Sequence, residues 1–230
     1  MVQPIESRQL HDIPLFADLE PAILEQLAQD SWLTPYATDN AVFYEGDRLP
    51  ACLHIIVSGR LCISKIAPSG KETILRILSA GEIFAAPAIF GNGIAPATAK
   101  AIESTTVLTI KKQTLLDSFA KTPELALHLL GILNQRLQQL HKQVHGLASE
   151  RAIVRLVHYL EYVVQQSGTI PVETGEQLRS PHTYYQIARS IGITYEECVR
   201  LFKRLHPAVV YRRGGIITIC DRQHLNSFRE

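Results

Sequence analysis

The hydrophobic positions of the first 110 residues change from helical to strand-like spacing. Between residues 13 and 35, apolar side chains recur three or four positions apart, which predicts short helices. From about residue 36 to 110 they gather in short runs rich in β-branched residues, such as 53–57 and 105–110. Glycines punctuate these runs at Gly46, Gly59, Gly70 and Gly81. Short strands at such regular turn spacing indicate a β-roll, a cupin-like double-stranded β-helix.

Helical spacing returns at Pro123 and forms an unusually long apolar stripe. Its members are Leu125, Leu129, Ile132, Leu133, Leu137, Leu140, Val144 and Leu147. A small barrel cannot cover a stripe of this length, whereas a second copy of the same helix can, as in a coiled coil. We therefore predict a dimerisation helix over 122–147 and a homodimer. Packing of the whole stripe within its own chain is the alternative. A further helix opens near Ser149 and stops at Gly168, and residues 169–181 are predicted to be a connector.

Two short helices are predicted within residues 182–205, which read HTYYQIARSIGITYEECVRLFKRL. Gly192 makes the turn between them, and Thr194 is a suitable N-cap for the second helix. This is the pattern of a helix-turn-helix, in which the start of the second helix meets base edges in the major groove. The residues predicted to contact DNA from this helix are Thr194, Tyr195, Glu196, Arg200 and Lys203. Arg can donate two bonds to guanine and Glu can accept one from cytosine, but an i,i+4 ion pair between Glu196 and Arg200 is an alternative.

A basic hairpin is predicted directly after the second helix. Two β runs flank the turn that contains Arg212, Arg213 and two glycines, which is typical of a wing. Its arginines can reach phosphates, which position a protein on DNA without reading the sequence. The ordered set of helix, glycine turn, helix and basic hairpin predicts binding of double-stranded DNA by a winged helix-turn-helix.

Charge and composition support this division of the 230 residues. Residues 1–147 hold 12 Lys and Arg against 14 Asp and Glu, and residues 148–230 hold 11 against 8, so the basic excess lies in the C-terminal part. We predict an α+β protein with a sensor domain over 1–121, the dimerisation helix over 122–147 and the DNA-binding domain over 148–230. The four cysteines have no metal-site spacing, which predicts reduced thiols.

Several other classes of protein are excluded by what the sequence lacks. No apolar run is long enough for a membrane span and no secretory h-region is present, which predicts a cytoplasmic protein without membrane contact. No Walker loop, HExxH, GxSxG or GxGxxG motif occurs, so we predict that the protein is not an enzyme. The remaining alternative is a ligand-binding or protein-interaction module whose winged helix does not bind DNA.

The whole chain resembles the CRP/FNR family of bacterial transcription regulators. The resemblance rests on the glycine-spaced strands, the long helix, the winged helix, and the Glu-x-x-x-Arg motif formed by Glu196 and Arg200. It implies base reading by these two residues, and recruitment of RNA polymerase by an activator. Relatives often have Arg at the position of Tyr195, which implies a different preference at that base.

The effector side departs from the cyclic-AMP-binding members of that family. Their phosphate cassette corresponds here to Ala85-Ala86-Pro87, and their Arg-Ser pair to Pro96-Ala97. Without the arginine the phosphate has no fixed partner, which argues against cyclic AMP in the usual mode. No cysteine precedes Cys52, which argues against an iron–sulfur cluster. The predicted effector pocket comprises Phe84, Ala85, Ala86, Pro87, Pro96, Ala97 and Thr98.

The same stretch looks most like the denitrification and nitric-oxide-responsive subgroup. Some members of that subgroup are haem sensors, so the resemblance makes haem a possible cofactor, with His11 or His54 as candidate axial ligands. The alternative for each is an ordinary histidine, and the identity of the effector stays open.

Overall fold

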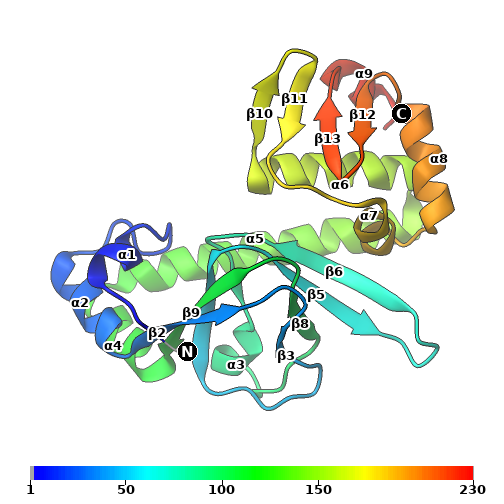
Figure 1. Ribbon diagram of the computed structural model, residues 1–230. Helices are drawn as coiled ribbons and strands as arrows, with labels where there is room; N and C mark the ends of the chain where they lie inside the picture. Colours follow the sequence, from blue (N-terminus) through cyan, green and yellow to red (C-terminus); the bar gives the residue numbers. More distant parts are fainter. Residues whose placement is uncertain (1–2, 230) are drawn as a thin grey trace. The chain divides into compact units, whose positions relative to one another are not determined.

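The computed structural model describes residues 3–229 and divides the chain into two compact units. The first holds the chain up to Leu137 except for residues 72–74, and the second holds the remainder (Figure 1). No helix among residues 3–229 is long and apolar enough to cross a bilayer.

The first unit is a β-roll made of two antiparallel sheets. The five-stranded sheet has the order β1 (Gln3–Pro4), β2 (Ser31–Tyr36), β9 (Thr105–Lys111), β4 (Cys52–Ser58), β7 (Ile83–Phe84). The other has the order β3 (Ala41–Phe43), β8 (Thr98–Ala101), β5 (Leu61–Ile66), β6 (Glu72–Leu78). The predicted roll is therefore confirmed. Its helices are α1 (Ser7–His11), α2 (Pro21–Gln29), α3 (Ala86–Phe90), α4 (Lys112–Lys121) and the start of α5 (Pro123–Ser149).

Glycine is required at the turn between β4 and β5. Gly59 has φ +80°, and a Cβ there would lie 2.3 Å from the carbonyl oxygen of Ser104. Only a residue without a side chain fits this close approach, which explains one of the regularly spaced glycines.

Side chains of β4 alternate between two cores. Leu53 and Ile55 belong to the core shared with the helices, whereas Ile56 belongs to the core between the two sheets. His54 lies on the same side as this second core, where its ring contacts Phe84 at a centroid distance of 5.5 Å.

The second unit is a winged helix built on α6 (Ala152–Ser167). Its sheet has the order β10 (Thr169–Val172), β11 (Gly175–Leu178), β13 (Ile216–Ile219), β12 (Val209–Arg212), as Figure 1 shows. The helices α7 (Tyr184–Ile191), α8 (Tyr195–Leu205) and α9 (Arg222–Ser227) complete it. One apolar core, which includes Leu160, Ile187 and Phe202, joins these elements.

The structure differs from the sequence predictions at three places. Residues 169–181 are not a simple connector, because β10 and β11 form a hairpin in the register Thr169 to Leu178. Residues 86–90 form the short helix α3, with a proline in its first turn, and the sequence pattern does not predict this helix. The long helix continues to Ser149, and α6 begins only at Ala152, because Arg151 has an extended backbone.

Candidate nucleic-acid interface and effector region

Local hydrogen bonds determine where α7 begins and ends. The Thr183 hydroxyl accepts from the backbone N–H of Gln186 at 3.2 Å, and the Gln186 side chain accepts from the Thr183 N–H at 2.9 Å. This is a capping box. At the other end Gly192 has φ +71°, and Ile193 donates to the carbonyl of Ala188. The left-handed glycine ends the helix and turns the chain toward α8, as the sequence predicts.

The recognition helix α8 has one buried and one exposed face. Thr194 caps it by accepting from the N–H of Glu197 at 3.1 Å. The buried face comprises Cys198, Leu201, Phe202 and Leu205. The candidate DNA-contacting residues from this segment are all exposed; they are Thr194, Tyr195, Glu196, Arg200 and Lys203. Glu196 and Arg200 are not joined by an ion pair within residues 3–229, so both side chains are available on the exposed face.

The wing is a hairpin in which Arg212 pairs with Ile216 across the turn. Gly215 has φ +83°, and a Cβ there would lie 2.9 Å from backbone atoms of His182. The N–H of His182 donates to the carbonyl of Gly215 at 2.9 Å. These contacts attach the wing to the segment that precedes α7, with Arg213 exposed in the turn.

The position of His182 could not be inferred from the sequence. Its side chain is buried; Nδ1 lies 2.8 Å from the Tyr159 hydroxyl and Nε2 lies 3.0 Å from the Ser180 hydroxyl. Residues on α6, on the connecting segment and on the wing therefore meet at one histidine. No motif signals this contact, because the three elements are far apart in the sequence.

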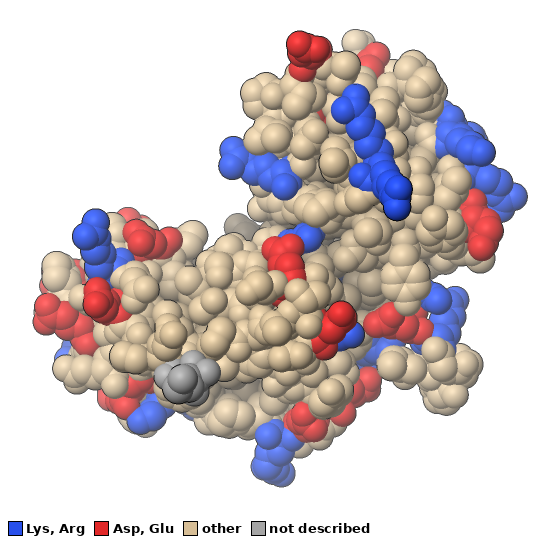
Figure 2. Space-filling view, in the orientation of Figure 1, with Lys and Arg blue, Asp and Glu red and all other residues tan. Residues whose placement is uncertain are grey.

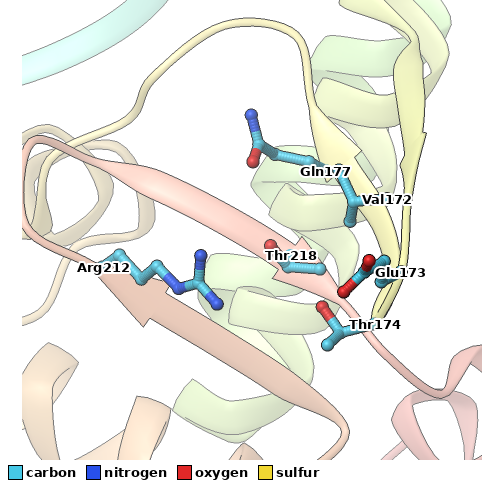
Figure 3. A pocket seen from close by; sticks show the side chains of 6 residues that line it. All are labelled: Val172, Glu173, Thr174, Gln177, Arg212 and Thr218. Atoms are coloured by element: carbon cyan, nitrogen blue, oxygen red, sulfur yellow. The ribbon is translucent and has the colours of Figure 1, made fainter.

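Basic side chains lie on several parts of the second unit. Figure 2 shows Lys and Arg over the edge formed by α8, with acidic side chains at one end of this group, and further basic side chains over the middle and the opposite side of the unit. Arg212 has a second neighbourhood: it lines a hollow on the sheet together with Glu173, Thr174 and Thr218. In Figure 3 its guanidinium extends across the sheet toward Thr218. A positive edge of this kind suits a polyanion.

The predicted effector segment is apolar and uncharged. Residues 83–99 contain no Asp, Glu, Lys, Arg or His. Phe84 is buried and its ring stacks on Phe43 at 6.0 Å, while Ala85 has a left-handed backbone at φ +56°. The Thr98 hydroxyl accepts from the N–H of Glu45 at 3.1 Å. Ala97 is buried, Ala85, Ala86 and Pro87 are partly buried, and Pro96 is exposed. The predicted pocket residues therefore range from buried to exposed.

The two candidate haem ligands differ in their surroundings. His11 is exposed at the end of α1. His54 is buried; its Nδ1 lies 3.3 Å from the Thr109 hydroxyl, and its Nε2 has no hydrogen-bond partner among the described residues. Burial lowers the pKa of His54 to about 4, so the imidazole is neutral at pH 7.

The two units match different protein-family models. Residues 33–122 match the cyclic nucleotide-binding domain, and residues 154–228 match the Crp-like helix-turn-helix domain. A CRP-like cAMP-activated global transcriptional regulator of Mycobacterium tuberculosis is 27% identical over 92% of this chain and 94% of its own length. The fumarate and nitrate reduction regulatory protein of Salmonella typhimurium is 28% identical over 80% of this chain and 73% of its own.

Solved structures of low sequence identity share the fold. FixK2 from Bradyrhizobium japonicum superposes with a TM-score of 0.74 at 19% identity, covering 87% of this chain and 98% of that one. A CooA mutant from Carboxydothermus hydrogenoformans superposes with a TM-score of 0.77 at 19% identity, covering 100% of this chain and 98% of that one. The matched domains and the relatives are those of transcription regulators, not of enzymes. The chain belongs to the CRP/FNR family of DNA-binding transcription regulators.

Proposed function

We propose that the protein acts as an effector-responsive homodimer on a palindromic DNA site. The observation that carries this proposal is an apolar stripe on α5 that its own protomer leaves exposed. Its members are Leu127, Leu130, Leu137, Leu140, Val144 and Leu147, each at least half exposed. From Leu130 onward the spacing is that of a coiled-coil seam, which a second α5 would cover. Residues 122–147 would thus join the sensor domain (1–121) to the DNA-binding domain (148–230).

A two-fold dimer would present two α8 helices to successive major grooves, about 34 Å apart, so the site would be palindromic. In each half-site Glu196 and Arg200 would read base edges. Thr194 and Lys203 would contact the backbone nearby. Arg212 and Arg213 on the wing would bind phosphates.

Substitution of Arg200 tests this assignment. We expect Arg200→Ala to weaken binding to the selected site by about 1–3 kcal/mol and to relax base choice at one position, because a bidentate contact to guanine is lost. Arg213→Ala is the matched control: it should weaken binding to all sequences alike. Fluorescence anisotropy on matched and mutated duplexes measures both effects. Unchanged affinity and selectivity of Arg200→Ala would refute the assignment.

Salt dependence separates DNA binding from a protein-interaction role of the winged helix. Counterion release makes the affinity for duplex DNA fall steeply as the salt concentration rises. A titration of the wild-type protein from about 50 to 200 mM salt should therefore show a steep decrease in affinity. Absence of duplex binding at the lowest salt concentration, with and without candidate effectors, would favour the interaction role.

The effector is proposed to act in the β-roll near residues 83–99. The matched domain and the named relative point to cyclic AMP, but the residues of this segment do not fit it, because none supplies a charge for the phosphate. An uncharged or apolar signal suits the segment better. Binding should shift the roll relative to α5 and so alter the spacing of the recognition helices. Isothermal titration with cyclic AMP should show no binding, and tight stoichiometric binding would overturn this view.

Haem is a second candidate, favoured by the resemblance to nitric-oxide-responsive regulators and by the Nε2 of His54, which has no hydrogen-bond partner in the described part of the chain. When bound, haem would supply an iron that coordinates a diatomic gas. His54 is buried, so it could hold haem only if the residues around it moved, whereas His11 is exposed and accessible without rearrangement. An absorption spectrum after haem addition should show a Soret band that is shifted and sharpened relative to that of free haem, and His11→Ala or His54→Ala should abolish this change. A spectrum identical to that of free haem would exclude haem binding.

We also infer that DNA binding recruits RNA polymerase and activates transcription, as the family resemblance implies. In vitro transcription from a promoter carrying the selected site should increase with added protein. The Arg200→Ala variant provides the control, because it should leave basal transcription unchanged. A decrease in transcript would identify a repressor instead.

A further inference from the structure

Four aromatic rings beside the start of α8 in the second unit form one cluster, here called the aromatic cluster. It comprises Tyr184 at the start of α7, Tyr195 and Phe202 on α8, and Tyr211 on β12. Three elements that are separate in the sequence thus meet through side chains of one kind. The cluster lies within the same unit as the candidate DNA-contacting residues, and the proposed function does not account for it.

Tyr184 is the centre of the aromatic cluster. Its ring stacks on Tyr211 with centroids 3.7 Å apart and planes 16° apart. It meets Phe202 at 5.1 Å and Tyr195 at 5.9 Å, the latter edge to face at 88°. Such pairs contribute beyond the area that they bury, because edge-to-face and stacked rings have favourable electrostatics. The ring of Tyr195 is therefore supported from one side by a ring that the wing itself holds.

The other side of Tyr195 is open. The residue is 51% exposed, and it is the first residue of α8, directly before Glu196. Residues at this end of a recognition helix reach base edges in the major groove. A tyrosine there is rigid and presents an apolar ring with one hydroxyl, so it cannot form the bidentate bond that Arg makes to guanine. The apolar feature that the major groove offers to such a ring is the C5-methyl group of thymine.

Resting on the proposed role of α8 in base reading, we propose that Tyr195 is a specificity-determining residue that reads a thymine methyl group in each half-site. Tyr184 and Tyr211 are positioning residues that hold its ring in place. This arrangement adds a third base contact beside those of Glu196 and Arg200. It also makes base choice at one position depend on the position of the wing, because Tyr211 on β12 holds Tyr184.

Selection of binding sites from a pool of randomised duplexes is the first test. The wild-type protein should select thymine at the position next to that read by Glu196, and Tyr195→Ala should lose preference at that position only. Tyr44→Ala, which removes a tyrosine that is 63% exposed in the other unit, should behave like the wild type. Tyr195→Arg should change the selected base from thymine to guanine. Selection of another base by the wild type would overturn the proposal.

Replacement of that thymine by uracil removes only the methyl group. Affinity of the wild type, measured by fluorescence anisotropy, should fall about fourfold, the factor that burial of one methyl-sized group supplies. The affinity of Tyr195→Ala should not change, whereas Tyr195→Phe should retain the discrimination. Equal wild-type affinity for both duplexes would overturn the proposal. A uniform loss by Tyr195→Ala on all sequences would identify a phosphate contact and would overturn it as well.

The positioning residues are tested by the same thymine-to-uracil comparison. Tyr184→Leu should abolish the fourfold difference in affinity between the thymine and uracil duplexes, while base choice at the positions read by Glu196 and Arg200 is retained. Tyr184→Phe, which keeps the ring, should retain the fourfold difference. Tyr211→Leu offers a second route if Tyr184→Leu does not fold, as judged by circular dichroism. Full discrimination in both folded leucine variants would refute the positioning role. If the wild type selects no sequence at all, the proposed function itself fails, which is a different result from selection without thymine.

Discussion

Stability in mild acid should depend strongly on His54. The side chain is buried between the sheets of the roll, and burial lowers its pKa from the usual 6.5 to about 4. Between these two pH values the unfolded chain binds a proton that the folded chain does not. The free energy of unfolding therefore has its full value above about pH 6.5 and falls as the pH decreases toward 4.

The size of this effect follows from the pKa difference. A shift of one unit corresponds to about 1.4 kcal/mol, so the full effect of His54 is about 3 kcal/mol per chain at or below pH 4. At pH 5 the loss relative to pH 8 is about 2 kcal/mol. Such a loss is a large fraction of the stability of an ordinary domain.

Urea denaturation of the wild type and of His54→Gln, at pH 8 and pH 5 and at one protein concentration, measures this contribution. Fluorescence of Trp32, the single tryptophan, reports on β2 in the same unit. All other groups are the same in the two proteins. Between pH 8 and pH 5 the free energy of unfolding should therefore fall by about 2 kcal/mol more in the wild type than in His54→Gln. His11→Gln, at an exposed position, should behave like the wild type. Parallel losses in wild type and His54→Gln would refute the reasoning.

Three further predictions concern other parts of the chain. Leu140→Glu places a charge in the exposed stripe of α5, so sedimentation should show monomers and duplex affinity should fall; an unchanged dimer would contradict the coiled-coil seam. Gly215→Ala should destabilise the protein by about 1–3 kcal/mol in urea, and by more than Gly214→Ala, because only at Gly215 would a Cβ meet backbone atoms. The thiol of Cys198 is buried and its pKa is raised to about 12, so mass spectrometry should show slower alkylation by iodoacetamide than at the partly exposed Cys220; equal rates would contradict this burial.

Much of the architecture could be predicted from the spacing of hydrophobic residues and from the positions of glycines at turns. Regularly spaced glycines and short β-branched runs were enough for the roll, because turns and strand alternation are local properties. The helix-turn-helix was predictable for the same reason: Thr183, Gly192 and Thr194 act on residues within four positions of themselves. The elements that were missed, α3 and the β10–β11 hairpin, are short, and their sequences contain prolines that equally suit a loop.

What the sequence determined by itself was therefore the order and type of the major elements, together with the exposed basic face of α8, since these depend on neighbours along the chain. Only the tertiary structure decided which distant side chains meet. It placed Tyr184 between Tyr195 and Tyr211, and it buried His54 against Phe84, where one ring nitrogen has no hydrogen-bond partner among residues 3–229. Contacts of this kind depend on how strands and helices pack in three dimensions, which no local spacing records.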